Sequence, residues 1–194
     1  MNPIKRFTSR ILKKIRNDEA MEEKLARWRS LGAAIGKNIF IGFDVVIDEG
    51  FAEFLTIEDN VVIAARTFII LHDSALNNIS GDPIRVGKVT LKEQAYIGAN
   101  VTILPGVTIG SKAIVGAGSV VTRDVPDGMV AVGNPAAVRT AVSTVRSRLV
   151  EQPPRPGIFH WDILPWRERR EKMTAEEIHE SYTRFVDQAR QQKS

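Results

Sequence analysis

The chain has 194 residues, of which 43% are hydrophobic, and a formal net charge of +4. This composition is ordinary for a folded domain and excludes an intrinsically disordered protein. The absence of cysteine excludes disulfides, thiolate metal sites and a cysteine nucleophile, and it fits a reducing compartment. No apolar run approaches the roughly 20 residues of a membrane span, and the N-terminus lacks the apolar core of a signal peptide, so we expect a cytoplasmic protein.

The N-terminal segment, residues 1–16, is basic and amphipathic. It carries six Lys or Arg residues and no acidic residue, while Ile4, Phe7, Ile11 and Ile15 recur at helical spacing. Such a helix either packs its apolar stripe on the body of the protein or rests weakly on an anionic membrane surface, and the sequence leaves both open. We expect the first 30 residues to form an N-terminal helical cap. No motif for binding nucleic acid accompanies the basic charge.

A six-residue repeat runs through most of residues 35–126. From Leu91 onward the chain divides into the hexads LKEQAY, IGANVT, ILPGVT, IGSKAI, VGAGSV and VTRDVP. Each begins with a branched aliphatic residue, and two earlier runs that start at Ile35 and Ile57 follow the same rule. A period of six fits neither a helix nor an alternating strand, but it fits short strands joined by tight turns, three to a triangular coil. The repeat predicts an all-β core over residues 31–140, a left-handed parallel β-helix.

The repeat is interrupted at a histidine. His72 is the only histidine in the repeated region, and residues 73–88 leave the pattern before the hexads resume. Long loops in compact domains are uncommon and often functional, although a tolerated surface insertion is the alternative. We therefore expect His72 to belong to a site and the adjoining loop to help select its substrate.

Beyond the repeat, residues 141–194 are expected to form an arm and a last helix. Residues 151–166 are rich in proline and aromatic residues. Thr174 and Glu177 have the spacing of a capping box, which predicts that a helix begins there. The other two histidines of the chain lie in this extension, where packing or solvent exposure explains them more simply than chemistry does.

The segments AYIGANVTILPGVTIG, AIVGAGSVVTRDVP and AVGNPAAV, with the histidine at the loop root, resemble the hexapeptide-repeat acetyltransferases. The resemblance covers roughly residues 35–140 and is closest to sugar and polysaccharide O-acetyltransferases. It implies direct acetyl transfer from acetyl-CoA to a sugar or saccharide hydroxyl, without a metal. His72 is then the general base, because an imidazole exchanges protons near neutral pH. Asp73 or a backbone carbonyl is a candidate for orienting its ring.

The same resemblance implies a homotrimer with CoA in the groove between adjacent β-helices. The backbones at Ala99 and Ala117 match positions that contact the pantetheine arm. Thr122 and Arg123 match a pair near the adenosine phosphates, and Arg139 is a second candidate there. The candidates for acceptor binding are Asp73, Asn77 and Tyr96.

Other functions are known for proteins with a similar repeat. N-acetylation of an amino sugar, free or nucleotide-linked, uses the same scaffold and stays open. A β-helix that only binds or acts as a scaffold is the non-enzyme alternative, against which the presence of His72 argues. A γ-type carbonic anhydrase is excluded because its zinc needs three histidines, two of them close in sequence, and His72 is the only histidine in the repeated region. The ending GAGSVVTRDVP argues against the acyl-carrier-protein-dependent transferases of lipid A synthesis.

Overall fold

The computed structural model describes residues 18–151 and 172–191. The predicted amphipathic helix at residues 1–16 and nearly all of the proline-rich segment 151–166 lie outside these ranges.

The chain divides into two compact units, and the candidate site lies in the larger one. That unit spans residues 15–146, and the smaller one contains residues 1–14 and 147–194.

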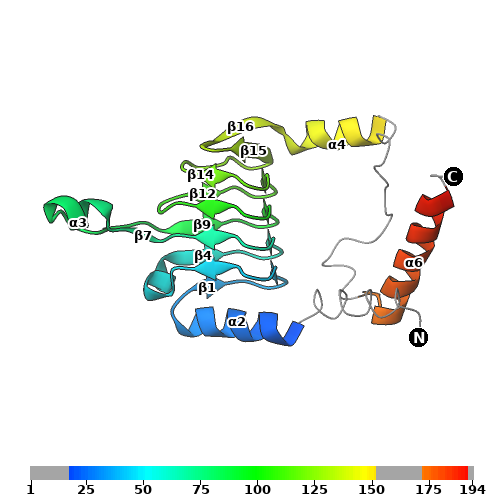
Figure 1. Cartoon of the computed structure of the whole chain (residues 1–194), viewed down its shortest axis with the longest axis horizontal. Coiled ribbons are helices and arrows are strands. Elements are labelled where there is room, and N and C mark those ends of the chain that lie inside the picture. Colours follow the sequence, from blue (N-terminus) through cyan, green and yellow to red (C-terminus); the bar gives the residue numbers. More distant parts are fainter. Residues whose placement is uncertain (1–17, 152–171, 192–194) are drawn as a thin grey trace. The chain divides into compact units, whose positions relative to one another are not determined.

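The core of the larger unit is a left-handed parallel β-helix, in which coils of short strands stack along one axis (Figure 1). Strands one coil apart pair in parallel and build three sheets. Sheet A has the order β1-β4-β9-β12, sheet B the order β2-β5-β10-β13-β15-β16, and sheet C the order β3-β6-β11-β14. These strands are β1 (Ala34–Ile35), β2 (Phe40–Ile41), β3 (Val46–Ile47), β4 (Leu55–Ile57), β5 (Val62–Ile63), β6 (Phe68–Ile69), β9 (Val89–Leu91), β10 (Tyr96–Ile97), β11 (Thr102–Ile103), β12 (Thr108–Ile109), β13 (Ile114–Val115), β14 (Val120–Val121), β15 (Met129–Gly133) and β16 (Ala136–Ala141).

The register keeps the first residue of each hexad in line along the axis. In sheet B, for example, Ile97 pairs with Ile63 on one side and Val115 on the other, and all three are 0% exposed. Each aliphatic side chain therefore packs on its equivalent about 4.8 Å away, which keeps water out of the centre of every coil. The β-helix predicted from the hexads is confirmed.

Helix α2 (Asp18–Ser30) covers the first coil. Its Leu25 and Trp28 are each 1% exposed, and the Lys24 Nζ donates a hydrogen bond to the Val45 carbonyl at 2.7 Å. At the other end, β15 and β16 form an antiparallel hairpin that continues sheet B and leads into α4 (Val142–Glu151). An N-terminal helix is thus present as predicted, and it shields the apolar cross-section that a solenoid leaves open.

The last described helix is α6 (Ala175–Gln191), in the smaller unit. The Glu177 carboxylate accepts hydrogen bonds from the Thr174 N–H at 2.6 Å and the Thr174 hydroxyl at 2.9 Å, while the Glu177 N–H donates back to that hydroxyl at 3.3 Å. The hydrogen bond from the Thr174 backbone also lowers the pKa of Glu177. The predicted capping box and C-terminal helix are confirmed. None of the helices in the described ranges is long and apolar enough to cross a membrane.

Candidate active site

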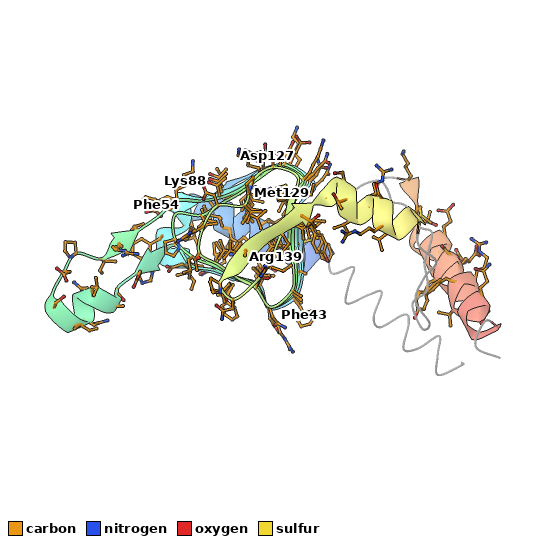
Figure 2. All side chains as sticks on the ribbon, turned by 90° about the horizontal axis from the view of Figure 1, so that it is seen from above. Phe43, Phe54, Lys88, Asp127, Met129 and Arg139 are labelled. Carbon is orange, nitrogen blue, oxygen red and sulfur yellow. The ribbon has the colours of Figure 1, made fainter. Side chains whose placement is uncertain are left out.

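Figure 2 looks down the axis of the β-helix and shows its triangular section. We name each corner after the sheets it joins. The CA corner consists of the turns 48–54, 70–88, 104–107 and 122–124. The BC corner consists of the turns 42–45, 64–67, 98–101 and 116–119. Phe54 and Lys88 mark the CA corner, Phe43 marks the BC corner, and Asp127 marks the third corner (Figure 2).

The segment that follows His72 forms a hairpin that projects from the CA corner (Figure 1). Strand β7 (His72–Asp73) pairs antiparallel with β8 (Arg85–Val86), and helix α3 (Ala75–Ser80) lies at the tip. Asp73 makes its contacts within the hairpin. One carboxylate oxygen accepts a hydrogen bond from the Ala75 N–H at 2.9 Å, and the other lies 3.8 Å from the Arg85 guanidinium. The interruption in the hexads is therefore a defined structural element with the histidine at its root.

His72 lies between a carboxylate and an aromatic ring. Its Nδ1 forms a hydrogen bond with the Asp48 carboxylate, and the side chains are 32% and 20% exposed. The ring centroid of Phe51 is 4.6 Å from that of the imidazole, with 31° between the planes. Within the described residues, Nε2 makes no hydrogen bond. The imidazole is thus held at one nitrogen and open at the other, which is the arrangement a general base requires.

Asp48 belongs to the coil before that of His72. Because Ile47 pairs with Ile69 in sheet C, Asp48 lies beside the chain that leads into His72, and its N–H donates to the Ile69 carbonyl at 3.1 Å. The carboxylate that orients the ring is therefore that of Asp48, not that of Asp73.

Asp48 and Phe51 were not predicted from the sequence, although the sequence carries a signal for them. The first hexad positions step from Ile47 to Ile57, ten residues instead of six. This surplus of four residues places a second insertion at the corner where the hairpin later leaves, one coil earlier. Two insertions at one corner, in successive coils, must lie side by side.

The earlier insertion forms the short 3-10 turn η1 (Glu49–Phe54). The Phe51 N–H donates to the Asp48 carbonyl at 3.0 Å. Arg27 of helix α2 donates to the two Glu49 carboxylate oxygens at 2.8 and 2.6 Å. This hydrogen bonding lowers the pKa of Glu49 and raises that of Arg27. The turn is therefore tied both to Asp48 and to the N-terminal helix.

The predicted CoA-binding residues are divided between two corners. Ala99 and Ala117 lie one above the other at the BC corner, where the Gly118 N–H donates to the Ala99 carbonyl at 2.8 Å. Thr122 and Arg123 are exposed at the CA corner, two coils beyond His72.

The remaining candidates are scattered. Arg139 is exposed in β16, at the end of sheet B (Figure 2). The Asn77 side chain lies in the hairpin and donates to the Asp82 carbonyl at 2.8 Å. Tyr96 is 45% exposed on the outer face of sheet B, away from the CA corner of the same chain. Only Thr122, Arg123 and Asp73 thus share a corner with His72, together with Asn77 farther out on its hairpin.

The family model of the bacterial transferase hexapeptide, with six repeats, matches residues 88–123. That match spans the strands from β9 to β14, which are the third and fourth coils. Together with the earlier hexads and the β-helix that they build, the match shows that the chain carries the hexapeptide repeat of bacterial transferases and is similar to proteins named as acetyltransferases.

Three curated proteins illustrate the similarity. YvoF of Bacillus subtilis (strain 168), whose name assigns it provisionally as an acetyltransferase, is 36% identical over 115 residues, which are 59% of this chain and 64% of the relative. The galactoside O-acetyltransferase of Escherichia coli (strain K12) is 34% identical over 114 residues, 54% of this chain and 51% of the relative. The dTDP-3-amino-3,6-dideoxy-alpha-D-galactopyranose 3-N-acetyltransferase of Aneurinibacillus thermoaerophilus is 49% identical over 67 residues, 34% of this chain and 35% of the relative. Each match spans less than two thirds of the relative's own length.

Proposed function

We propose that this chain is an acetyl-CoA-dependent O-acetyltransferase acting on a sugar or saccharide hydroxyl, with His72 as the general base. The main observation that supports the proposal is how the imidazole of His72 is bonded and where it lies. Asp48 engages its Nδ1, Nε2 makes no hydrogen bond within the described residues, and the ring lies at the root of the projecting hairpin. Relatives named as O-acetyltransferases support the class of reaction.

In this mechanism the donor supplies an acetyl group activated as a thioester. The Asp48 carboxylate accepts a hydrogen bond from the Nδ1–H of His72, which leaves Nε2 unprotonated and able to act as the base. Nε2 takes the proton of the acceptor hydroxyl as the hydroxyl oxygen forms its bond to the acetyl carbonyl carbon. When the carbon–sulfur bond breaks, Nε2 returns that proton to the departing sulfur. The step needs no nucleophile from the protein, so a chain without cysteine can perform it.

The residues present fit the donor. Small side chains at Ala99 and Ala117 leave the backbone of the BC corner open to close approach by an extended ligand. Arg123 is exposed and forms no ion pair with any described residue, so its guanidinium is available to a phosphate group. Thr122 lies beside it, and Arg139 is a second candidate cation.

The division of these residues between two corners supports a homotrimer as part of the proposal. The outer face of sheet C joins the two corners, and its Val46 and Phe68 are 47% and 48% exposed. If a neighbouring copy covers this face, the BC corner of one copy can approach the CA corner of the next. The groove between two copies would then contain a complete set of donor and base residues.

A second candidate function is N-acetylation of an amino sugar. The relative from Aneurinibacillus thermoaerophilus, whose name assigns it to a nucleotide-linked amino sugar, favours this alternative. The same base and donor residues would serve, because an amine also loses a proton during acyl transfer.

The test is to incubate the protein with acetyl-CoA and a panel of sugars, oligosaccharides, amino sugars and nucleotide-linked amino sugars. We expect mass spectrometry to find one product heavier by an acetyl group, and alkaline hydrolysis to separate an ester from an amide. The His72→Ala variant should keep its fold and bind CoA but lose roughly 10²- to 10⁴-fold in rate. Unimpaired turnover by this variant would contradict the role of His72. The absence of both an acetylated product and CoA binding would favour the alternative that this β-helix is a scaffold without catalytic activity.

A further inference from the structure

Turn η1 and the projecting hairpin are the two insertions at the CA corner. The hairpin begins at His72, and η1 begins directly after Asp48. Since β3 and β6 are neighbours in sheet C, the two insertions leave the coil from adjacent levels. The turn therefore lies against the root of the hairpin, where the base of the proposed function is located.

The contact between the two insertions is made by Phe51. Its ring packs on the imidazole of His72 at 4.6 Å between centroids and 31° between planes. A tilted ring pair at this centroid separation is in favourable contact, and the contact restricts rotation of the smaller ring. Asp48 holds the same imidazole at its edge through the hydrogen bond to Nδ1. The hydrogen bond to Asp48 and the contact with the Phe51 ring together define one orientation of the imidazole.

The backbone around Phe51 is itself held in place. Ala52 is 0% exposed, and the Leu55 N–H closes the turn on the Ala52 carbonyl. The Phe51 N–H is bonded to the Asp48 carbonyl at 3.0 Å, and Glu49 is bonded to Arg27 through both carboxylate oxygens. Phe54, three residues further along the same turn, is 36% exposed and makes no ring contact with His72.

We infer that Phe51 is a positioning residue for His72: its ring keeps the imidazole in the orientation in which Asp48 holds Nδ1 and Nε2 faces the acceptor. This inference rests on the proposed role of His72 as general base. Phe51 touches neither donor nor acceptor in this account and acts through the imidazole alone. Loss of its ring should therefore impair the chemical step more than the binding of either substrate.

The experiment compares Phe51→Ala with the matched variant Phe54→Ala, using the full chain. We expect Phe51→Ala to lower kcat by roughly tenfold or more, because small misplacements of a catalytic group are costly, with little change in the KM for acetyl-CoA. Phe51→Tyr keeps the ring and should retain most of the rate. Phe51→Leu keeps most of the volume without a flat ring, and it replaces Phe51→Ala if that variant does not fold by circular dichroism.

A second readout does not depend on turnover. The ¹⁵N shifts of the imidazole report which ring nitrogen carries the proton, and the chain has three histidines, so the His72→Ala variant identifies the signals of His72. We expect one dominant tautomer in the wild type and in Phe54→Ala, and a mixture in Phe51→Ala. Equal kinetics and equal spectra in the two alanine variants would overturn the inference. If the wild type shows no transferase activity, the proposed function fails, and the spectra still decide whether Phe51 orients the ring.

Discussion

At the scale of single residues, the chemistry proposed for this chain depends on one imidazole and its neighbours. A histidine on a β-helix corner becomes a general base only when one nitrogen is fixed and the other is left free. Asp48 fixes Nδ1 of His72 here, although 24 positions separate the two residues in the chain. The two residues are nevertheless close in space, because one turn of the β-helix returns the chain to the same corner.

We predict that Asp48→Asn lowers kcat without unfolding the protein. The amide is close in size to the carboxylate, but it lacks the negative charge that stabilises the imidazolium formed when Nε2 takes a proton. The expected loss is roughly 10- to 100-fold, measured as kcat in the acetyltransferase assay. Asp44→Asn is the control, because Asp44 is exposed in the BC corner turn of the same coil and its φ of 54° suits asparagine. Equal rates in the two variants would contradict the role of Asp48.

At the scale of elements, the β-helix depends on close contact between successive corners. The backbone of Gly98 is not in the left-handed conformation that favours glycine. A Cβ on it would, however, lie 2.5 Å from the Ala117 nitrogen and 2.8 Å from the Val115 carbonyl oxygen. Glycine is thus required at this position for close approach between coils rather than for turning the chain. The left-handed conformations are supplied nearby by Asn100 and Gly118, with φ of 55° and 72°.

We predict that Gly98→Ala destabilises the β-helix by about 1–3 kcal/mol, since a backbone atom of the next coil must move to admit the methyl group. The measurement is the free energy of unfolding from a denaturant titration. Gly50→Ala is the matched control: a Cβ there meets nothing within 4 Å. Its effect should stay within about 0.5 kcal/mol. Equal stability of both variants would show that the coils can separate at this corner without cost.

At the scale of the whole molecule, one chain does not gather all the residues predicted for the site. His72, Thr122 and Arg123 lie at the CA corner, while Ala99 and Ala117 lie at the BC corner. The two corners are the edges of sheet C, whose outer face includes exposed Phe68 and Val46. A homotrimer is proposed because packing of that face would both bury it and bring complementary corners of two copies together.

We predict a particle mass in solution of about three times the 21.5 kDa chain, measured by light scattering after size-exclusion chromatography. Phe68→Asp should shift the mass to that of the single chain, because a carboxylate would have to be buried in the proposed interface. Thr56→Asp, on the outer face of sheet A, should leave the mass unchanged. A wild-type particle of one chain would contradict the homotrimer.

The sequence by itself determined the architecture, because a hexad with an aliphatic first position can be satisfied only by stacking short strands in register. Ile97 and Val115, which are three hexads apart, were placed in line by spacing alone, and their burial follows from that spacing. The local signals were equally informative at the C-terminal helix, where Thr174 and Glu177 form the capping box that their separation predicts. His72 was found for the same reason, since a break in a strict repeat is visible without any structure.

Only the tertiary structure decided what surrounds His72. Asp48 and Phe51 reach it from the preceding coil. The ten-residue step from Ile47 to Ile57 indicates an insertion at that corner, but it does not tell which of its side chains meet the histidine. Asp73, the obvious neighbour in sequence, is bonded instead to Ala75 and lies near Arg85 within the hairpin. Consecutive residues of a strand point to opposite faces, so the residue next to the base in the chain is directed away from it. The contacts of the base depend on which corners stack on one another, and that is a property of the folded coil.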